Sequence, residues 1–178
     1  MQLVKASRDA LLKPLQVVSG IVERRQTLPI LANILVRKDG ERVSFTATDL
    51  EIQIQTSADI GAGKDAAATT VAARKLVDIL RALPEADVAL SLSNRKLAIA
   101  SGKSRFNLQT LAAEEYPTVA QAEFTADFTL PASTFKYLLS MVHFAMAQQD
   151  IRYYLNGMLL VVDGTTVRAV ATDGHRLA

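Results

Sequence analysis

The chain has 178 residues and a formal net charge of +2, with 49% hydrophobic residues, 21% charged residues and no cysteine. This composition predicts a packed core. The lack of cysteine excludes disulfides, thiol catalysis and cysteine-based metal sites, and it fits a reducing cytosol. The N-terminal segment has no uninterrupted apolar run, so it supports neither a signal peptide nor a membrane span, and the net charge alone is too small to indicate a nucleic-acid partner.

The first predicted helix begins at Ser7, a candidate N-cap, and its spacing places Leu11 and Leu15 on one face. Pro14 falls inside this helix and predicts either a kink or a later start. Strict alternation of apolar and polar residues then predicts strands at residues 42–48 and 51–55, each with one covered face.

The second half of this pattern repeats the first. A helix is predicted over residues 74–83, ended by Pro84, and is followed by alternating strands. These strands are residues 88–93, 96–100 and 105–109. A third helix is predicted after Pro131. Short strands at residues 3–5, 69–71 and 128–130 lead into the three helices, so the unit is a strand, a helix and about three strands. Two helices side by side are then expected to cover one side of antiparallel sheets.

A much longer repeat spans the chain. Residues 35–49 read LVRKDGERVSFTATD and residues 159–173 read LLVVDGTTVRAVATD, so Asp49 recurs as Asp173, 124 residues later. So long a period indicates tandem copies of a whole domain rather than a short-period solenoid. We therefore expect one domain at residues 1–125 and a truncated copy at residues 126–178, joined by an acidic linker over residues 112–127.

Asp173 and His175 form the one pair that resembles a catalytic dyad. The pair indicates catalysis only weakly, because the chain has no cysteine nucleophile and no G-x-S-x-G elbow, and its sequence places no third polar group beside the pair. The first copy of the repeat also lacks the histidine, which favours an aspartate that caps local backbone N–H groups. A small hydrolase that uses this pair stays open as an alternative. For His143, which lies in an apolar setting, a packed side chain is favoured over a metal ligand.

Basic residues gather on or beside the predicted helices. Taken singly, each indicates no more than a solvated helix surface, but as a group they fit backbone-only contact with a polyanion. The set is Arg8, Lys13, Arg24, Arg25, Arg74, Lys75, Arg81 and Lys136. A purely structural repeat scaffold without DNA affinity is the third reading of the chain.

Several motifs together resemble a known family. They are LLKPLQVVSG, TLPILANIL, TATDLE, ARKLVDILRALPE, SGKSRFNLQTL, QQDIRYYLNGMLL and VATDGHRLA, in this order. The chain is similar to the bacterial DNA polymerase III β subunit, the β sliding clamp, over its N-terminal part. The resemblance implies an α+β DNA-clamp fold, with antiparallel sheets outside, two helices per domain on the inner face, and tandem domains of which the second is truncated here.

The resemblance also implies a function. The family is a DNA polymerase processivity factor, a head-to-tail homodimeric ring that encircles double-stranded DNA in the cytoplasm and has no enzymatic activity or cofactor. It tethers DNA polymerase III core, the clamp loader and other clamp-motif proteins. Its DNA contacts match Arg25, Arg74, Gln149, Tyr153 and Tyr154, with Arg152 as a plausible neighbour.

A second implied site is a groove for short partner peptides, which gives His175 a role other than catalysis. Its lining matches Leu155, Thr172, Gly174, His175, Arg176 and Leu177. On this interpretation the rest of the groove and a third domain lie in sequence absent here. The chain is then expected to bind partner peptides feebly and to be unable to close a ring by itself, with the first domain's half of the dimer contact near residues 96–108.

Overall fold

The computed structural model describes residues 1–22, 28–84, 87–119 and 127–178. It divides into two compact units, Met1–Gln121 and Ala122–Ala178, and each is considered by itself. The expected domain boundary between residues 125 and 126 lies outside the described residues.

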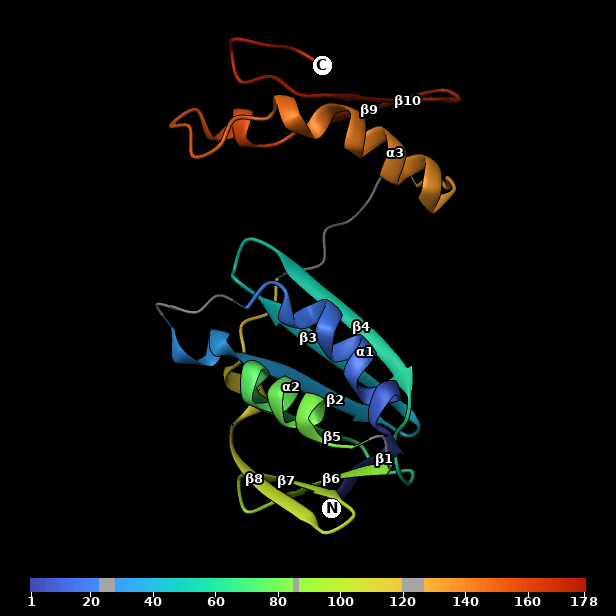
Figure 1. Cartoon of the computed structure of the whole chain (residues 1–178), viewed down its shortest axis with the longest axis vertical. Helices are drawn as coiled ribbons and strands as arrows, with labels where there is room; N and C mark the ends of the chain where they lie inside the picture. Colours follow the sequence, from blue (N-terminus) through green and yellow to red (C-terminus); the bar gives the residue numbers. More distant parts are fainter. Residues whose placement is uncertain (23–27, 85–86, 120–126) are drawn as a thin grey trace. The chain divides into compact units, whose positions relative to one another are not determined.

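The first unit is built on one eight-stranded antiparallel sheet (Figure 1). Its strands are β1 (Gln2–Ser7), β2 (Asn33–Asp39), β3 (Arg42–Thr48), β4 (Gln53–Asp59), β5 (Ala67–Ala72), β6 (Asp87–Ser93), β7 (Lys96–Ser101) and β8 (Ser104–Leu111). They are arranged in the order β1-β6-β7-β8-β5-β2-β3-β4. The two halves of the sheet join through only two residue pairs between β5 and β8, Thr70 with Leu111 and Val71 with Thr110.

Two helices, α1 (Arg8–Ser19) and α2 (Ala73–Ala82), pack against each other, α1 on β3 and β4 and α2 on β5 (Figure 1). Leu11, Leu15 and Leu76 are completely buried in the core between helices and sheet. The α+β fold with antiparallel strands and paired helices is therefore confirmed. Short 3₁₀ turns lie at Pro29–Ala32 and Ala113–Glu115.

The start of α1 follows the expected capping chemistry. The Ser7 hydroxyl accepts a hydrogen bond from the N–H of Ala10 at 3.3 Å, which satisfies one of the free donors of the first turn. The helix then continues through Pro14 to Ser19, so the alternative of a later start was wrong. The carbonyl of Pro14 accepts a hydrogen bond from the hydroxyl of Thr56 on β4 at 3.2 Å.

The segment after β4 closes the sheet against β1. Gly61 bridges Val4, and its N–H donates to the carbonyl of Glu41 at 2.7 Å. A Cβ at Gly61 would overlap the carbonyl oxygen of Gly40 and lie 2.9 Å from the backbone of Glu41, so only glycine fits. The buried Lys38 ammonium donates to the carbonyls of Gly63, at 3.1 Å, and Asp65, and holds the segment that follows Gly61.

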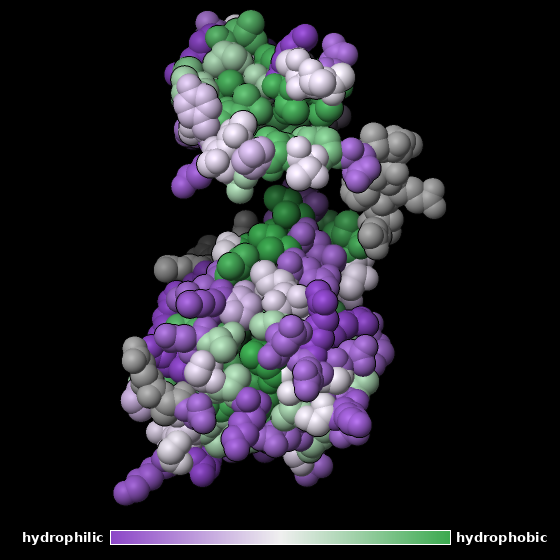
Figure 2. Space-filling model, turned by 90° about the vertical axis from the view of Figure 1, so that its right-hand side faces the viewer, coloured by the Kyte–Doolittle hydropathy of each residue, from purple (hydrophilic) through white to green (hydrophobic). Residues whose placement is uncertain are grey.

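The second unit contains α3 (Ala132–Val142) and a hairpin of β9 (Leu159–Asp163) and β10 (Thr166–Val170), with 3₁₀ turns at His143–Ala145 and Tyr153–Asn156. Its small core consists of Val142, Ala145 and Ala171. Figure 2 shows apolar surface on the visible face of this unit, and exposed hydrophobic residues include Leu159 and Val162.

The strand expected at residues 128–130 is wrong, because this segment is not in a strand. Its counterpart β1 pairs with β6, whereas residues 128–130 pair with no strand in the described part of the second unit. Without a partner strand the backbone of this segment forms no ladder.

Candidate functional site

The loop after β10 is a tight turn organised by two side chains. The Thr172 hydroxyl donates to the carbonyl of Arg176 at 2.7 Å and accepts the N–H of Gly174 at 3.1 Å. The Asp173 carboxylate accepts the N–H groups of His175 and Arg176 at 2.9 and 3.0 Å. Gly174 has φ +89°, a left-handed conformation that glycine adopts without a steric penalty.

The same turn occurs in the first unit with the same hydrogen bonds. Thr48 donates to the carbonyl of Ile52 at 2.7 Å and accepts the N–H of Leu50 at 3.0 Å. Asp49 accepts the N–H groups of Glu51 and Ile52 at 2.9 and 2.7 Å. The prediction that the repeated aspartate caps local N–H groups is therefore confirmed. The turn also explains why β4 begins at Gln53 and not at residue 51.

The chemistry of Asp173 is that of a turn residue. Hydrogen bonds from the N–H groups of His175 and Arg176 lower the pKa of its carboxyl, and the charge of Arg176 adds to this effect. Its second oxygen accepts from Nε of Arg176 at 2.9 Å. Over the described ranges, the His175 ring makes no hydrogen bond to a carboxylate, and no three acidic or histidine side chains form a metal-binding group.

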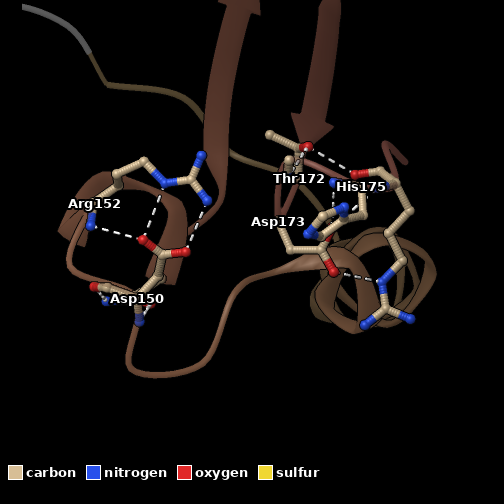
Figure 3. Close-up of polar contacts among 8 residues, drawn as sticks. Asp150, Arg152, Thr172, Asp173 and His175 are labelled. Carbon is tan, nitrogen blue, oxygen red and sulfur yellow. Dashed lines mark hydrogen bonds and ion pairs between the residues drawn. The ribbon is translucent and has the colours of Figure 1, made fainter.

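A second loop, which carries Asp150 and Arg152, faces this turn (Figure 3). Asn156 closes the loop. The Asn156 amide accepts the N–H of Asp150 and donates to the Asp150 carbonyl, both at 3.0 Å. The Asp150 carboxylate accepts from Nε and Nη2 of Arg152 at 3.0 and 2.8 Å and from the Arg152 N–H at 2.8 Å. The hydrogen bonds from the Arg152 side chain, and then the one from its N–H, lower the pKa of Asp150 to about 2. The side-chain hydrogen bond to Asp150 and the charge of Asp150 raise the pKa of Arg152.

Two cavities flank the Thr172 turn. The larger, about 440 Å³, is lined mainly by polar side chains from both loops, together with the apolar Met146 and Ala147; the polar residues are Gln148, Asp150, Arg152, Asp173, His175 and Arg176. The smaller, about 200 Å³, is mainly apolar and is lined by Tyr154, Leu155, Gly157, Leu159, Val170, Ala171 and Thr172. Arg176 also lies 5.8 Å from the ring centre of Phe144, within cation–π range.

The expected groove residues thus divide between the two cavities. Leu155 and Thr172 line the apolar cavity, and His175 and Arg176 line the polar one. Gly174 forms the turn between them, and Leu177 is 74% exposed. Arg152, a predicted neighbour of the DNA contacts, lies in the wall of the polar cavity and is paired with Asp150.

The expected DNA contacts lie in both units. Arg25 is outside the described residues, and Arg74 on α2 is exposed, with Nη2 3.4 Å from the carbonyl of Val22. In the second unit, Tyr153 and Tyr154 are 82% and 68% exposed and meet edge to face at 6.0 Å. Gln149 has φ +56°, which is uncommon for a residue of this type.

Sequence reasoning missed the Asp150–Asn156 pair. The residues stand six positions apart in a loop without regular periodicity, and neither is distinctive by type. The only available signal was the acidic–basic spacing of Asp150 and Arg152, which is common on protein surfaces. None of the helices in the described part of the chain is long and apolar enough to cross a membrane.

Comparisons with known proteins agree over almost the whole chain. A model of the N-terminal domain of the DNA polymerase III beta subunit matches residues 1–120, and a model of the central domain of that subunit matches residues 129–178. The beta sliding clamp of Pseudomonas aeruginosa is 49% identical over 173 residues, which are 96% of this chain and 47% of the relative. The chain therefore spans about half the length of the curated relatives it matches.

Solved structures give the same result. A Pseudomonas aeruginosa sliding clamp bound to griselimycin superposes with a TM-score of 0.94 and 46% identity, covering 99% of this chain and 48% of that one. A sliding clamp from Caulobacter crescentus gives 0.89 and 40%, with 99% and 49% covered. The chain belongs to the DNA polymerase III beta subunit family, the sliding clamps.

Proposed function

We propose that this chain is part of a DNA polymerase processivity factor that holds replication proteins on double-stranded DNA in the cytoplasm and is not an enzyme. The observation that carries the proposal is the match of both units, in order, to the N-terminal and central domains of the clamp subunit. In the complete protein, two subunits would join head to tail around the duplex.

The proposed DNA binding rests on contacts with the phosphate backbone and not on recognition of the bases. Arg74 lies exposed on α2, and Tyr153 and Tyr154 offer hydroxyl groups from an exposed turn. Guanidinium and hydroxyl donors suit phosphate oxygens, which carry no sequence information. Because a closed ring holds the protein on the duplex, each phosphate contact can be weak, and the protein can slide along the DNA.

The partner side of the proposal is the Thr172 turn with its two cavities. A small apolar cavity beside a polar one suits a short peptide that buries one apolar anchor and presents polar groups next to it. The solved Pseudomonas aeruginosa clamp bound to griselimycin supports a ligand-binding surface of this kind. We extend griselimycin binding to this chain, with the groove at Leu155 and Thr172–Leu177.

A salt titration tests the DNA side. Binding of a fluorescent duplex of about 20 base pairs is measured by anisotropy for the chain and for Arg74→Ala. If Arg74 contacts one phosphate, its loss weakens binding and reduces the salt slope by about 0.9. Arg105→Ala removes the same charge from an exposed residue on β8 and is expected to change binding less. Equal effects of the two variants would contradict a specific phosphate contact at Arg74.

The partner side is tested by titrating griselimycin and following backbone amide resonances. The amides of Gly174, His175 and Leu177 are expected to shift, while those of β6 and β7 in the first unit stay in place. No response near the Thr172 turn at millimolar griselimycin would remove the groove assignment. Hydrolytic turnover lost in His175→Ala would instead favour the enzyme alternative, and unchanged DNA binding in Arg74→Ala would favour the structural scaffold.

A further inference from the structure

The side chain of Asn156 and two backbone hydrogen bonds close the loop that carries Asp150. The Asn156 carboxamide bonds both the N–H and the carbonyl of Asp150 at 3.0 Å, as a paired strand residue would. The Leu155 N–H also donates to the Arg152 carbonyl at 2.8 Å, and the Ala147 N–H donates to the Leu155 carbonyl at 2.9 Å. The loop is therefore closed by internal hydrogen bonds and not by a hydrophobic core.

This closure determines where the Asp150 carboxylate points. The carboxylate accepts the Arg152 N–H, which fixes its direction, and then binds Nε and Nη2 of the same residue. A two-point contact of this kind fixes the plane of a guanidinium as well as its position. Figure 3 shows the Arg152 side chain folded around the Asp150 carboxylate, on the side of the loop that faces the Thr172 turn.

The fixed guanidinium lies against the opposite turn. A Cβ built on Gly174 would be 3.3 Å from Nη1 and 3.4 Å from Nη2 of Arg152, so the two residues are in close contact. The Thr172 turn is rigid through its own hydrogen bonds. Arg152 lines the polar cavity together with Asp173 and His175, the two neighbours of Gly174, so movement of the guanidinium would change the width of that cavity.

We propose that Asn156 is a positioning residue for the groove, which acts through Asp150 to hold the Arg152 guanidinium against Gly174. This inference rests on the proposed function, since the surface that it shapes is the groove for partner peptides. Asn156 itself is absent from the lining of both cavities, so its effect on a ligand is indirect.

The first test follows the groove without ligand. In Asn156→Ala, the chemical shifts of the Arg152 Nε–H and of the Gly174 amide are expected to change. The chemical shift of the Ala169 amide within β10 is expected to stay the same. Asn107→Ala, which changes an exposed asparagine on β8 of the first unit, is the matched control. Unchanged Arg152 and Gly174 signals in Asn156→Ala would overturn the proposal.

The second test asks whether the effect passes through Arg152. With griselimycin as the probe, Asn156→Ala is expected to weaken binding about three- to tenfold, the range for losing a partly buried pair of hydrogen bonds. In an Arg152→Ala background the same change should cost less than about twofold, because the guanidinium that it positions is gone. Fully additive losses would show a merely structural role and overturn the proposal.

Two outcomes separate this proposal from the proposed function. If the wild-type chain binds griselimycin but Asn156→Ala binds it equally well, only the positioning role fails. If the wild-type chain shows no response at the Thr172 turn, the groove and the positioning role fail together. If Asn156→Ala unfolds the β9–β10 hairpin, Asp150→Asn is the alternative variant, because it keeps the backbone hydrogen bonds to Asn156 and removes the carboxylate. Unchanged Arg152 and Gly174 chemical shifts in Asp150→Asn would overturn the proposal.

Discussion

Tyr116 fixes the end of the first unit to its sheet through a single hydroxyl group. The hydroxyl accepts the N–H of Thr48 and donates to the carbonyl of Asn33, both at 3.2 Å. The ring is 5% exposed and packs in a small cluster with Leu35 and Ala113. Tyr116→Phe keeps this packing and removes only the two hydrogen bonds, so it measures their contribution.

The expected loss follows from burial of the two partners. Thr48 is completely buried and Asn33 is 8% exposed, so the change leaves a donor and an acceptor with little access to water. A buried polar group without a partner costs about 1–3 kcal/mol, partly offset because the hydroxyl no longer has to be desolvated. We expect Tyr116→Phe to reduce the free energy of unfolding of the first unit by about 1.5–3 kcal/mol.

Urea unfolding followed by residue-resolved hydrogen exchange measures this loss for each unit separately. Tyr137→Phe removes a hydroxyl from a side chain that is 65% exposed. This control is expected to change stability by less than about 0.5 kcal/mol. A loss below about 0.5 kcal/mol for Tyr116→Phe would refute the reasoning, because water would then have to satisfy both groups.

The same tyrosine makes a prediction about alkaline pH. Burial raises the pKa of Tyr116 above its ordinary value of 10.0, and the hydrogen bond from Thr48 opposes this shift in part. Below pH 10 the phenol is neutral in both folded and unfolded chains, so its contribution is fully present. Above pH 10 the unfolded chain ionises first, and stability falls. The stability gap between wild type and Tyr116→Phe should therefore narrow as pH rises above 10.

Three further changes test the seam of the sheet and the Asp150 loop. Gly61→Ala should destabilise the first unit by more than about 2 kcal/mol by urea unfolding, since its Cβ meets backbone, whereas Gly20→Ala, with one ordinary contact at 3.6 Å, should be near neutral. Lys38→Met should lower the free energy of unfolding by about 2 kcal/mol in the same assay, because two carbonyls lose their donor. It should also speed hydrogen exchange in the segment that follows Gly61, and unchanged protection there would contradict this. The Asp150 carboxyl should titrate at about pH 2 by ¹³C shift, so its stabilising contact is present above pH 4 and lost as pH falls through 2, and Arg152→Ala should move the midpoint towards 3.8.

Most of the fold could be predicted because its strands have one buried face and one solvent-exposed face, which gives an alternating sequence pattern. Alternation placed β3, β6 and β7 to within a residue or two, and the Ser7 cap placed the start of α1. The segment after residue 127 was harder to predict, because strand assignment there depends on partners that pair from far along the chain. Phe128 shows this limit, since its local pattern favours a strand but no ladder forms.

The site was predictable only in part, for a related reason. Leu155 and His175, which the resemblance assigns to a groove, line two separate cavities, and whether they bind a peptide stays a prediction. Long-range hydrogen bonds leave no mark in local sequence. Tyr116 was assigned to a linker although the carbonyl of Asn33, 83 positions away, accepts its hydroxyl. The pairing of Arg152 with Asp150 beside Gly174 was likewise not predicted.

The repeated turn shows how two copies of one scaffold come to differ. Leu50 has φ +83° and Gly174 has φ +89° in turns with the same hydrogen bonds, so the first unit carries a left-handed leucine where the second has glycine. The strain at Leu50 costs about 1–2 kcal/mol, whereas a glycine there would cost about 0.5–1 kcal/mol in backbone entropy. Leu50→Gly should therefore leave urea stability unchanged or raise it by up to about 1 kcal/mol.

The reverse change should behave differently. Gly174→Leu adds the same strain and also places a Cβ 3.3 Å from the Arg152 guanidinium, so it should destabilise the second unit by at least about 1 kcal/mol and displace Arg152. In the first unit the leucine at this position is 49% exposed, whereas in the second unit a side chain at Gly174 would meet the Arg152 guanidinium. If Gly174→Leu left the Arg152 Nε–H resonance in place, the requirement for glycine in the second unit would be one of backbone conformation alone, and the difference between the two turns would have no connection with the groove.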